Sequence, residues 1–159
     1  MTIHLPDLDA TWRLGRALAE AIRAHGPAAL LLDGPLGAGK TTLTRALVEA
    51  LPGGLEAEVA SPSFNLMNRY PTQPETVHID LYRESGGMLG EELEDILDDP
   101  TVLAVVEWAK RLPRPVEPAV HVTWQQPPHE GRMVTLQGTG ERGRRIVEAV
   151  HTALAEGSR

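Results

Sequence analysis

The chain has 159 residues, enough for one domain with a sizeable hydrophobic core, and its 42% hydrophobic and 23% charged residues are ordinary for a globular protein. It contains no cysteine, which excludes disulfides and cysteine-ligated metal sites and suits a reducing cytoplasm. The net charge of −7 disfavours a domain that binds DNA or RNA by itself, and no apolar run is long enough for a membrane span.

The first half of the chain predicts two helices around a short buried strand. Asp9–His25 carries apolar side chains at helical spacing, with Asp9 as a candidate N-cap residue. Ala28–Asp33 is a continuous apolar run, the pattern of a strand buried on both faces of a parallel sheet. Lys40–Leu51 again has helical periodicity and follows a glycine-rich turn, so the order strand, turn, helix is expected here.

The second half is richer in strands and closes with a helix. The expected elements are two extended pieces within Glu58–Tyr70, strands at Thr76–Tyr82, Thr101–Trp108, Ala119–Gln125 and Arg132–Leu136, an acidic helix at Met88–Asp98 and a final helix at Gly140–Glu156. The pattern shows no repeat and no domain boundary. It therefore predicts one α/β domain over residues 1–159, with helices packed on a mixed, mostly parallel sheet.

The glycine-rich turn at Gly34–Thr41 reads Gly-Pro-Leu-Gly-Ala-Gly-Lys-Thr and fits the P-loop pattern G-x-x-x-x-G-K-[ST]. Glycines let the backbone wrap a phosphate without Cβ clashes, and the following helix presents its positive end to the anion. In this pattern Lys40 reaches the β- and γ-phosphates, Thr41 ligates magnesium and Thr42 lies near the α-phosphate. The sequence therefore predicts a P-loop NTPase-like domain with ATP and Mg²⁺ as cofactors.

A P-loop site also needs a carboxylate at the end of a neighbouring strand, and two acids qualify. Glu107 follows the more strongly apolar strand, and Asp80 follows the strand before it. Either could hold the metal or its water, and either could be a solvated acid at a strand end. His78 is expected to be a packed sheet histidine, and Trp108 to cover the core or the surface. Because the sequence has no N-K-x-D element for reading guanine, ATP is favoured over GTP.

Several short blocks follow one another along the chain. They are Gly34–Thr42, Ser61–Leu66 with Tyr70, His78–Arg83, Glu91–Leu93 and Val106–Trp108. In order and spacing, from Thr11 to about Arg132, they resemble the TsaE family motifs G-x-L-G-A-G-K-T-T, S-P-T-F-x-L…Y, H-x-D-L-Y-R, E-E-L and [IV]-E-W. Single motifs after the P-loop are weak, whereas their conjunction in order is specific. Ser63 stands where the family usually has threonine, and Pro35 where it usually has a polar residue, but neither change removes a group that the chemistry needs.

The resemblance implies a fold, an activity and partners. The fold would be a P-loop α/β sandwich, and the activity would be that of the Mg²⁺-dependent ATPase subunit in bacterial synthesis of threonylcarbamoyladenosine in tRNA. The subunit would act with the TsaB–TsaD complex, and it would meet tRNA only through that complex. The implied roles are phosphate binding by Gly37, Ala38, Gly39, Lys40, Thr41 and Thr42, magnesium binding by Thr41 and Glu107, water ordering by Asp80, nucleotide contacts by Thr11 and by Arg132 on the adenine side, and packing beside the site by Trp108.

Two other functions also fit the P-loop. A P-loop kinase for a small molecule would need an acceptor pocket and an arginine-rich lid, and the acidic stretch near Glu91 does not resemble such a lid. A nucleotide-dependent binding module would hydrolyse ATP only incidentally. ATP turnover measured alone and then with TsaB–TsaD separates these alternatives from the accessory ATPase.

Overall fold

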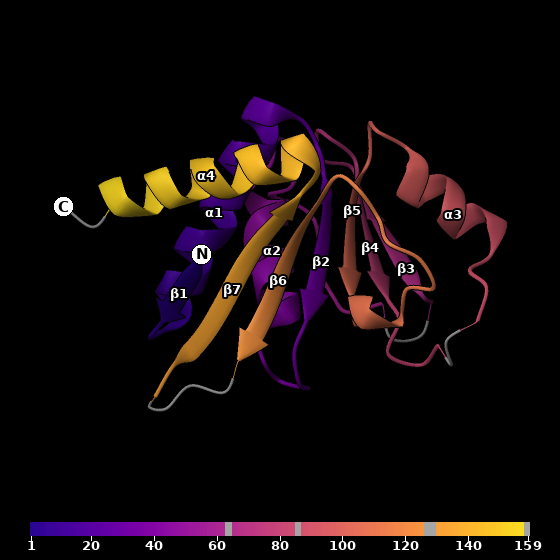
Figure 1. Ribbon diagram of the computed structural model, residues 1–159, viewed down its shortest axis with the longest axis horizontal. Helices are drawn as coiled ribbons and strands as arrows, with labels where there is room; N and C mark the ends of the chain where they lie inside the picture. The colour runs from indigo at the N-terminus through magenta and orange to yellow at the C-terminus, as the bar shows by residue number, and fades with distance from the viewer. Residues whose placement is uncertain (63–64, 85–86, 126–129, 158–159) are drawn as a thin grey trace.

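The computed structural model describes residues 1–62, 65–84, 87–125 and 130–157. Within these residues seven strands form one sheet, and helices pack on both of its faces (Figure 1). The elements in chain order are β1 (Thr2–Leu5), α1 (Leu8–His25), β2 (Ala29–Asp33), α2 (Lys40–Ala50), β3 (Met67–Tyr70), β4 (Thr76–Asp80), α3 (Glu91–Asp98), β5 (Leu103–Glu107), the 3-10 helix η1 (Ala109–Arg111), β6 (Ala119–Gln125), β7 (Arg132–Thr139) and α4 (Gly140–Glu156).

The sheet has the strand order β1-β7-β6-β2-β5-β4-β3. Its four central neighbours, β6, β2, β5 and β4, run parallel to one another. The edges are antiparallel: β7 pairs with β6, β1 with β7, and β3 with β4. The predicted mixed, mostly parallel sheet is confirmed. Because β2, β5 and β4 lie side by side in parallel, the loops that follow them lie together at the carboxyl ends of these strands. In α/β folds this is where ligands bind.

The two faces of the sheet are covered by different helices. Successive side chains along a strand point to opposite faces. On β5, Leu103 and Val105 pack into the cluster that contains the apolar side chains of α1, α2 and α4. The side chains between them, Ala104 and Val106, pack instead with the apolar side chains of α3. Glu107 follows Val106 and therefore points to the same face as Val105, toward α2.

Several predicted elements agree closely with the structure. Strand β6 and helix α4 have the predicted bounds, and β2, α2 and β5 lie within the predicted ranges. The prediction of Asp9 as the N-cap of the first helix is wrong. The N-cap is Asp7, whose carboxylate accepts a hydrogen bond from the N–H of Ala10 at 2.8 Å, so Asp9 already lies in the first helical turn. Of the helices in the described part of the chain, none is long and apolar enough to cross a membrane.

The middle of the chain departs further from the prediction. In the stretch expected to hold two extended pieces, the strand that forms is β3, and the described residues before it form no strand. Side chains, and not a neighbouring strand, form hydrogen bonds with the backbone of Ala60. The Tyr70 hydroxyl and the Asn68 amide both donate to its carbonyl, at 3.2 Å each. Helix α3 begins at Glu91, three residues later than expected, and Met88 is 97% exposed.

Helix α1 packs closely on helix α2, which begins at the end of the P-loop. A Cβ added at Gly15 would lie 2.4 Å from the Cβ of Ala46 and 2.8 Å from its backbone carbon. Both atoms are rigid parts of the fold, so a side chain at Gly15 would push the two helices apart. Glycine at position 15 therefore allows α1 and α2 to pack at this short distance.

We expect Gly15→Ala to destabilise the protein. Overpacking a core costs about 1–3 kcal/mol, and the clash at 2.4 Å places this change at the upper end, against about 1 kcal/mol gained from helix propensity. The expected net loss in the free energy of unfolding is about 2 kcal/mol, measured by urea denaturation. Gly157→Ala is the matched control, because a Cβ there would approach no atom closer than 3.4 Å. Equal stability of the two variants would contradict the close-packing argument.

Candidate functional site

The P-loop joins β2 to α2 and has a backbone that favours glycine at two positions. Gly37 has a φ of 73° and Gly39 a φ of 109°, both in the left-handed region. A Cβ at Gly37 would meet nothing within 4 Å, so its backbone angle, and not a lack of space, is what favours glycine there. Gly39 is also the N-cap of α2, and the loop therefore ends where the N–H groups of the helix are free to bind an anion.

Lys40 is held within the site and not in solvent. Its side chain is buried, and its Nζ donates to the carbonyls of Gly34 at 2.7 Å and Pro35 at 2.9 Å. The same Nζ lies 4.4 Å from the centre of the Trp108 ring, within the range of a cation–π interaction. Burial of the ammonium lowers the pKa of Lys40, while the negative charge of Glu107 and those of two nearby aspartates partly oppose the change.

Thr41 and Glu107 are joined by a direct hydrogen bond. Thr41 lies in the first turn of α2, and its Oγ1 donates to Glu107 Oε1 at 2.8 Å. Glu107 is the last residue of β5 and is almost fully buried. His78, in the middle of β4, contacts the same carboxylate oxygen through its Nε2, also at 2.8 Å. The interpretation of Glu107 as a solvated strand-end acid is therefore wrong, because the carboxylate is buried and bonded on two sides.

The surroundings of Glu107 favour its ionised form overall. Burial has the largest single effect on the pKa of Glu107, and it raises the value. The hydrogen bond and charge of His78, the hydrogen bond of Thr41 and the charge of Lys40 act in the opposite direction. Together they bring the pKa of Glu107 below its ordinary value of 4.5. These contacts thus favour the charged carboxylate in spite of its burial.

Asp80 lies beside Glu107 but has different partners. The two residues are paired in the register of β4 and β5. Ser61 Oγ donates to Asp80 Oδ2 at 2.8 Å, and the backbone N–H of Tyr82 donates to Oδ1 at 2.8 Å. Asp80 is 8% exposed, so it too is not a solvated acid. The Ser63 and Phe64 positions of the same family motif lie outside the described residues.

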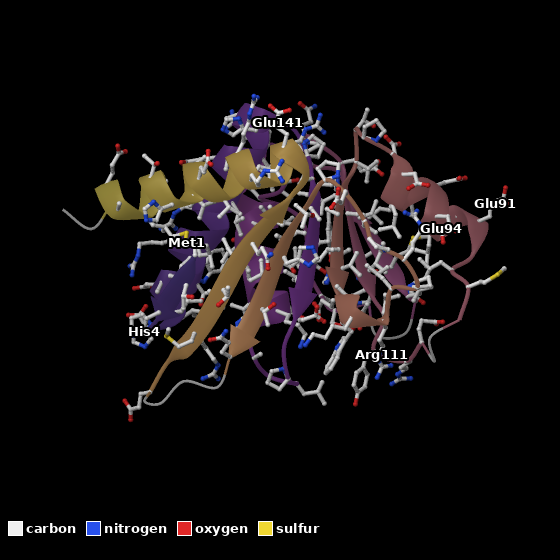
Figure 2. The ribbon with its side chains drawn as sticks, in the orientation of Figure 1. Met1, His4, Glu91, Glu94, Arg111 and Glu141 are labelled. Atoms are coloured by element: carbon white, nitrogen blue, oxygen red, sulfur yellow. The ribbon has the colours of Figure 1, made fainter. Side chains whose placement is uncertain are left out.

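Two aromatic side chains and an arginine pack together just after the carboxyl ends of β4 and β5. The ring centres of Trp108 and Tyr82 are 5.0 Å apart, and Arg111 lies against both rings. The Arg111 guanidinium lies 5.8 Å from the centre of each ring and donates to the carbonyls of Leu81, Tyr82 and Glu84. Figure 2 labels Arg111, the last residue of η1. This arrangement fixes Trp108 next to Lys40, as its predicted place beside the site requires.

The other residues predicted to bind the nucleotide lie in three places. Gly37, Ala38 and Arg132 line a pocket of about 250 Å³ on the outer side of the P-loop, together with Trp124 and Gln125. Thr42 is the half-buried third residue of α2. Thr11 lies on α1, where its hydroxyl donates to the Asp7 carbonyl at 3.5 Å. In the described part of the chain Thr11 makes no hydrogen bond to the P-loop, so its nucleotide contact stays a prediction.

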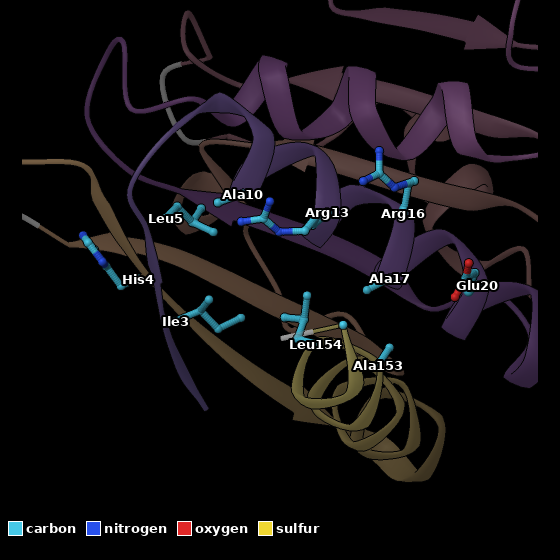
Figure 3. Close-up of a pocket in the computed structure, with 11 residues that line it drawn as sticks. Ile3, His4, Leu5, Ala10, Arg13, Arg16, Ala17, Glu20, Ala153 and Leu154 are labelled. Carbon is cyan, nitrogen blue, oxygen red and sulfur yellow. The ribbon is translucent and has the colours of Figure 1, made fainter. Parts of the chain in front are cut away.

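A further pocket, of about 270 Å³, lies between β1, α1 and the end of α4 (Figure 3). Its floor is apolar, and Arg13 and Arg16 stand at its side on α1. None of the residues predicted to bind phosphate, metal or base lines it. This pocket is therefore separate from the predicted nucleotide site.

Sequence reasoning missed several contacts of the site. His78 was expected to be a packed histidine, and it is packed, but it also holds Glu107. The two residues are 29 positions apart, so no local pattern could pair them. The signal available was the period of the strand, which places His78 and Asp80 on the same face. Trp124 was likewise missed: a Cβ at Gly34 would lie 2.8 Å from the Trp124 Cβ, so Trp124 packs directly against the P-loop.

Glu107→Gln tests the charge at this position in the nucleotide-free protein. Because folding lowers the pKa of Glu107, the ionised carboxylate contributes stability above the unfolded pKa, and this contribution is lost as the pH falls through the lower, folded pKa. We therefore expect the free energy of unfolding of the wild type, relative to Glu107→Gln, to be constant from about pH 7 to 5.5 and to decrease below about pH 4.5. Urea denaturation at matched pH measures the difference. A difference that rises as the pH falls would contradict the prediction.

Comparison with known proteins agrees with the motifs. The family model for "Threonylcarbamoyl adenosine biosynthesis protein TsaE" matches residues 5–134. A TsaE protein of Streptomyces coelicolor is 40% identical over 144 residues, covering 81% of this chain and 90% of the relative. TsaE proteins of Synechocystis and Mycobacterium tuberculosis are each 37% identical, covering 72% and 70% of this chain and 73% and 70% of the relatives. All three are named as tRNA threonylcarbamoyladenosine biosynthesis proteins.

A solved structure shares the fold. The crystal structure of YdiB from Bacillus subtilis superposes with a TM-score of 0.75, covering 96% of this chain and 94% of YdiB at 24% sequence identity. At that identity the similarity establishes the fold alone. The family assignment comes from the matching model and from relatives that cover most of this chain at well above 30% identity. The chain belongs to the TsaE family of threonylcarbamoyladenosine biosynthesis proteins.

Proposed function

We propose that this protein binds ATP with Mg²⁺ and hydrolyses it in support of threonylcarbamoyladenosine modification of tRNA. The observation that carries the proposal is the hydrogen bond from Thr41 to Glu107, at 2.8 Å. It joins the hydroxyl that follows the P-loop lysine to a buried carboxylate at the end of the adjacent strand, the two oxygen groups that a P-loop site needs for its metal.

The P-loop fits a nucleotide phosphate. The left-handed Gly37 and Gly39 let the backbone curve, and α2 offers free N–H groups and the positive end of its dipole. Lys40 adds a buried ammonium at the start of the same helix. Bound phosphate oxygens would accept from Lys40 Nζ, which in this structure donates to two loop carbonyls. The donors needed for a triphosphate are therefore concentrated at one place.

The side chains near the P-loop lysine fit magnesium. The Thr41 hydroxyl and the carboxylates of Asp80 and Glu107 offer only oxygen atoms, the ligands that Mg²⁺ prefers. No group of three or more histidine, cysteine, aspartate or glutamate side chains in the described part of the chain could hold a metal by itself. This suits Mg²⁺, which is commonly bound by one or two protein groups, water and the phosphates of the nucleotide. We assign Thr41 and Glu107 to the metal and Asp80 to the ordering of a water.

Each residue of the proposed site would have its own role in ATP hydrolysis. The metal supplies positive charge against the charge that develops on the phosphates. Lys40 opposes the same charge, in a buried position where electrostatic interactions are strong. Asp80 would orient a water, and Trp108 would keep its ring beside the Lys40 ammonium, whose Nζ lies 4.4 Å from the ring centre. On the base side, Arg132 and the pocket beside Gly37 would contact adenine.

The partners follow from the family and from charge. The relatives are named for tRNA modification, yet a net charge of −7 does not favour autonomous binding to a polyanion. We propose that the protein acts through the TsaB–TsaD complex, which meets the tRNA, and that it works in the cytoplasm. The rival kinase function would require arginines free to close over an acceptor. Arg114, beside the acidic helix α3, is instead paired with Glu94 and Asp98.

Replacing Lys40 by alanine tests the P-loop. Loss of the ammonium removes the main side-chain charge that opposes the β- and γ-phosphates, so we expect hydrolysis of ATP to fall at least about 100-fold. Stability is measured in parallel by urea denaturation, because Lys40 also donates to two loop carbonyls and its charge lowers the pKa of Glu107. Lys110→Ala is the control, because Lys110 is the other lysine of the chain and is exposed. Normal turnover by Lys40→Ala would show that the P-loop has no role in hydrolysis.

Replacing Glu107 by glutamine tests the metal ligand and the partner together. Glutamine keeps the size and loses the charge, so nucleotide should still bind while hydrolysis falls by at least about 10-fold. Wild-type turnover should rise when TsaB–TsaD is added, and Glu107→Gln should bind the complex without that rise. Steady-state phosphate release and pull-down by the complex measure the two effects, with exposed Glu117→Gln as the control. Partner-stimulated turnover at the wild-type level in Glu107→Gln would transfer the metal role to Asp80.

A further inference from the structure

His78 is a buried side chain whose polar contact lies entirely within the site. It sits in the middle of β4, with 0% of its surface exposed. Its Nε2 lies 2.8 Å from Glu107 Oε1, the same oxygen that accepts from Thr41 Oγ1. An ionised carboxylate can only accept hydrogen bonds, so Nε2 carries the proton of this contact. Both donors therefore meet on one oxygen of Glu107, one from a helix and one from a strand.

The second oxygen of Glu107 is left available. It has no hydrogen-bond partner among the described residues, whose only fully buried side-chain nitrogen or oxygen without a partner is His78 Nδ1. Glu107 Oε2 must therefore reach the surface of the site, where water or a ligand can satisfy it. The two hydrogen bonds to Oε1 thus determine which oxygen the carboxylate presents.

We propose that His78 is a positioning residue for the magnesium site, holding Glu107 Oε1 so that Oε2 faces outward to bind the metal or its water. This inference rests on the proposed ATPase function. Without His78, the buried carboxylate would keep one donor, Thr41, whose own oxygen is a metal ligand. A buried charge that loses a hydrogen bond turns toward water or takes up a proton, and either response removes the oriented oxygen.

The site geometry gives His78 this role and not a packing role alone. Neighbouring Thr76 is equally buried on the same face of β4, but its hydroxyl bonds to Thr72 and does not reach Glu107. Side chains that orient a metal ligand typically contribute about 10–100-fold in metal affinity. A packing role would lower stability without changing how the nucleotide complex depends on magnesium.

The test compares His78→Leu, His78→Gln and the control Thr76→Val. A fluorescent ATP analogue is titrated by anisotropy, first without Mg²⁺ and then at increasing Mg²⁺. For His78→Leu we expect unchanged affinity without Mg²⁺ and an increase of about 10-fold or more in the Mg²⁺ concentration for half-maximal effect. Glutamine places an amide N–H near the position of Nε2, so His78→Gln should restore most of the wild-type response, and Thr76→Val should match the wild type.

Each outcome has a distinct meaning. A wild-type Mg²⁺ response in a folded His78→Leu protein would overturn the inference, as would a loss in His78→Leu that His78→Gln does not restore. If His78→Leu does not fold, as judged by circular dichroism, His78→Gln is compared with His78→Asn, whose shorter side chain does not reach Glu107. Equal Mg²⁺ responses of that pair would overturn the inference. Failure of the wild type to bind the analogue would instead contradict the proposed function itself.

Discussion

The hydrogen bond from Thr41 to Glu107 is the constraint on which the rest of the site depends. Its two residues are 66 positions apart, in a helix and in a strand, and a 2.8 Å contact leaves little tolerance for movement. The contact requires that β5 lie beside β2 and that α2 pack across that face of the sheet. Apolar packing meets both requirements, since Leu43 and Leu47 of α2 share one core cluster with Val105 of β5. The hydrophobic core thus places the polar groups.

This placement is costly, and the cost argues for function. Lys40, His78, Asp80 and Glu107 are each less than a tenth exposed, and they gather at one edge of the sheet. Removing such groups from water is expensive, and apolar side chains of similar volume often give equal or greater stability. Within the site the charges compensate one another, as the lowered pKa of Glu107 shows. A buried, mutually compensated set of acids and bases beside a P-loop is what a site for a charged ligand requires.

The sequence predicted the parts of the fold that local chemistry decides. Helix α4 and strand β6 have clear periodicity and lie within their predicted bounds, and the glycine-rich turn lies between β2 and α2, where its spacing predicted it. Strand β1 was missed because it is short and depends on antiparallel pairing with β7, at the far end of the chain. The bond between His78 and Glu107 was also missed because it joins residues that are far apart in the sequence. Motifs identified the acids, but the register of β4 on β5 decided what each acid contacts.

Asp80 and Glu107 show how that register can separate two similar acids. They are direct neighbours across parallel strands, yet Glu107 accepts from a helix and a strand, whereas Asp80 accepts from Ser61 and Tyr82, in the segments that flank β3 and β4. The partners of Glu107 belong to the packed core and hold one geometry. The partners of Asp80 belong to connecting segments, which bury fewer apolar contacts and rearrange at lower cost. This difference supports the proposal that Glu107 binds the metal, which needs fixed geometry, and that Asp80 responds when nucleotide or a partner contacts the segment around Ser61.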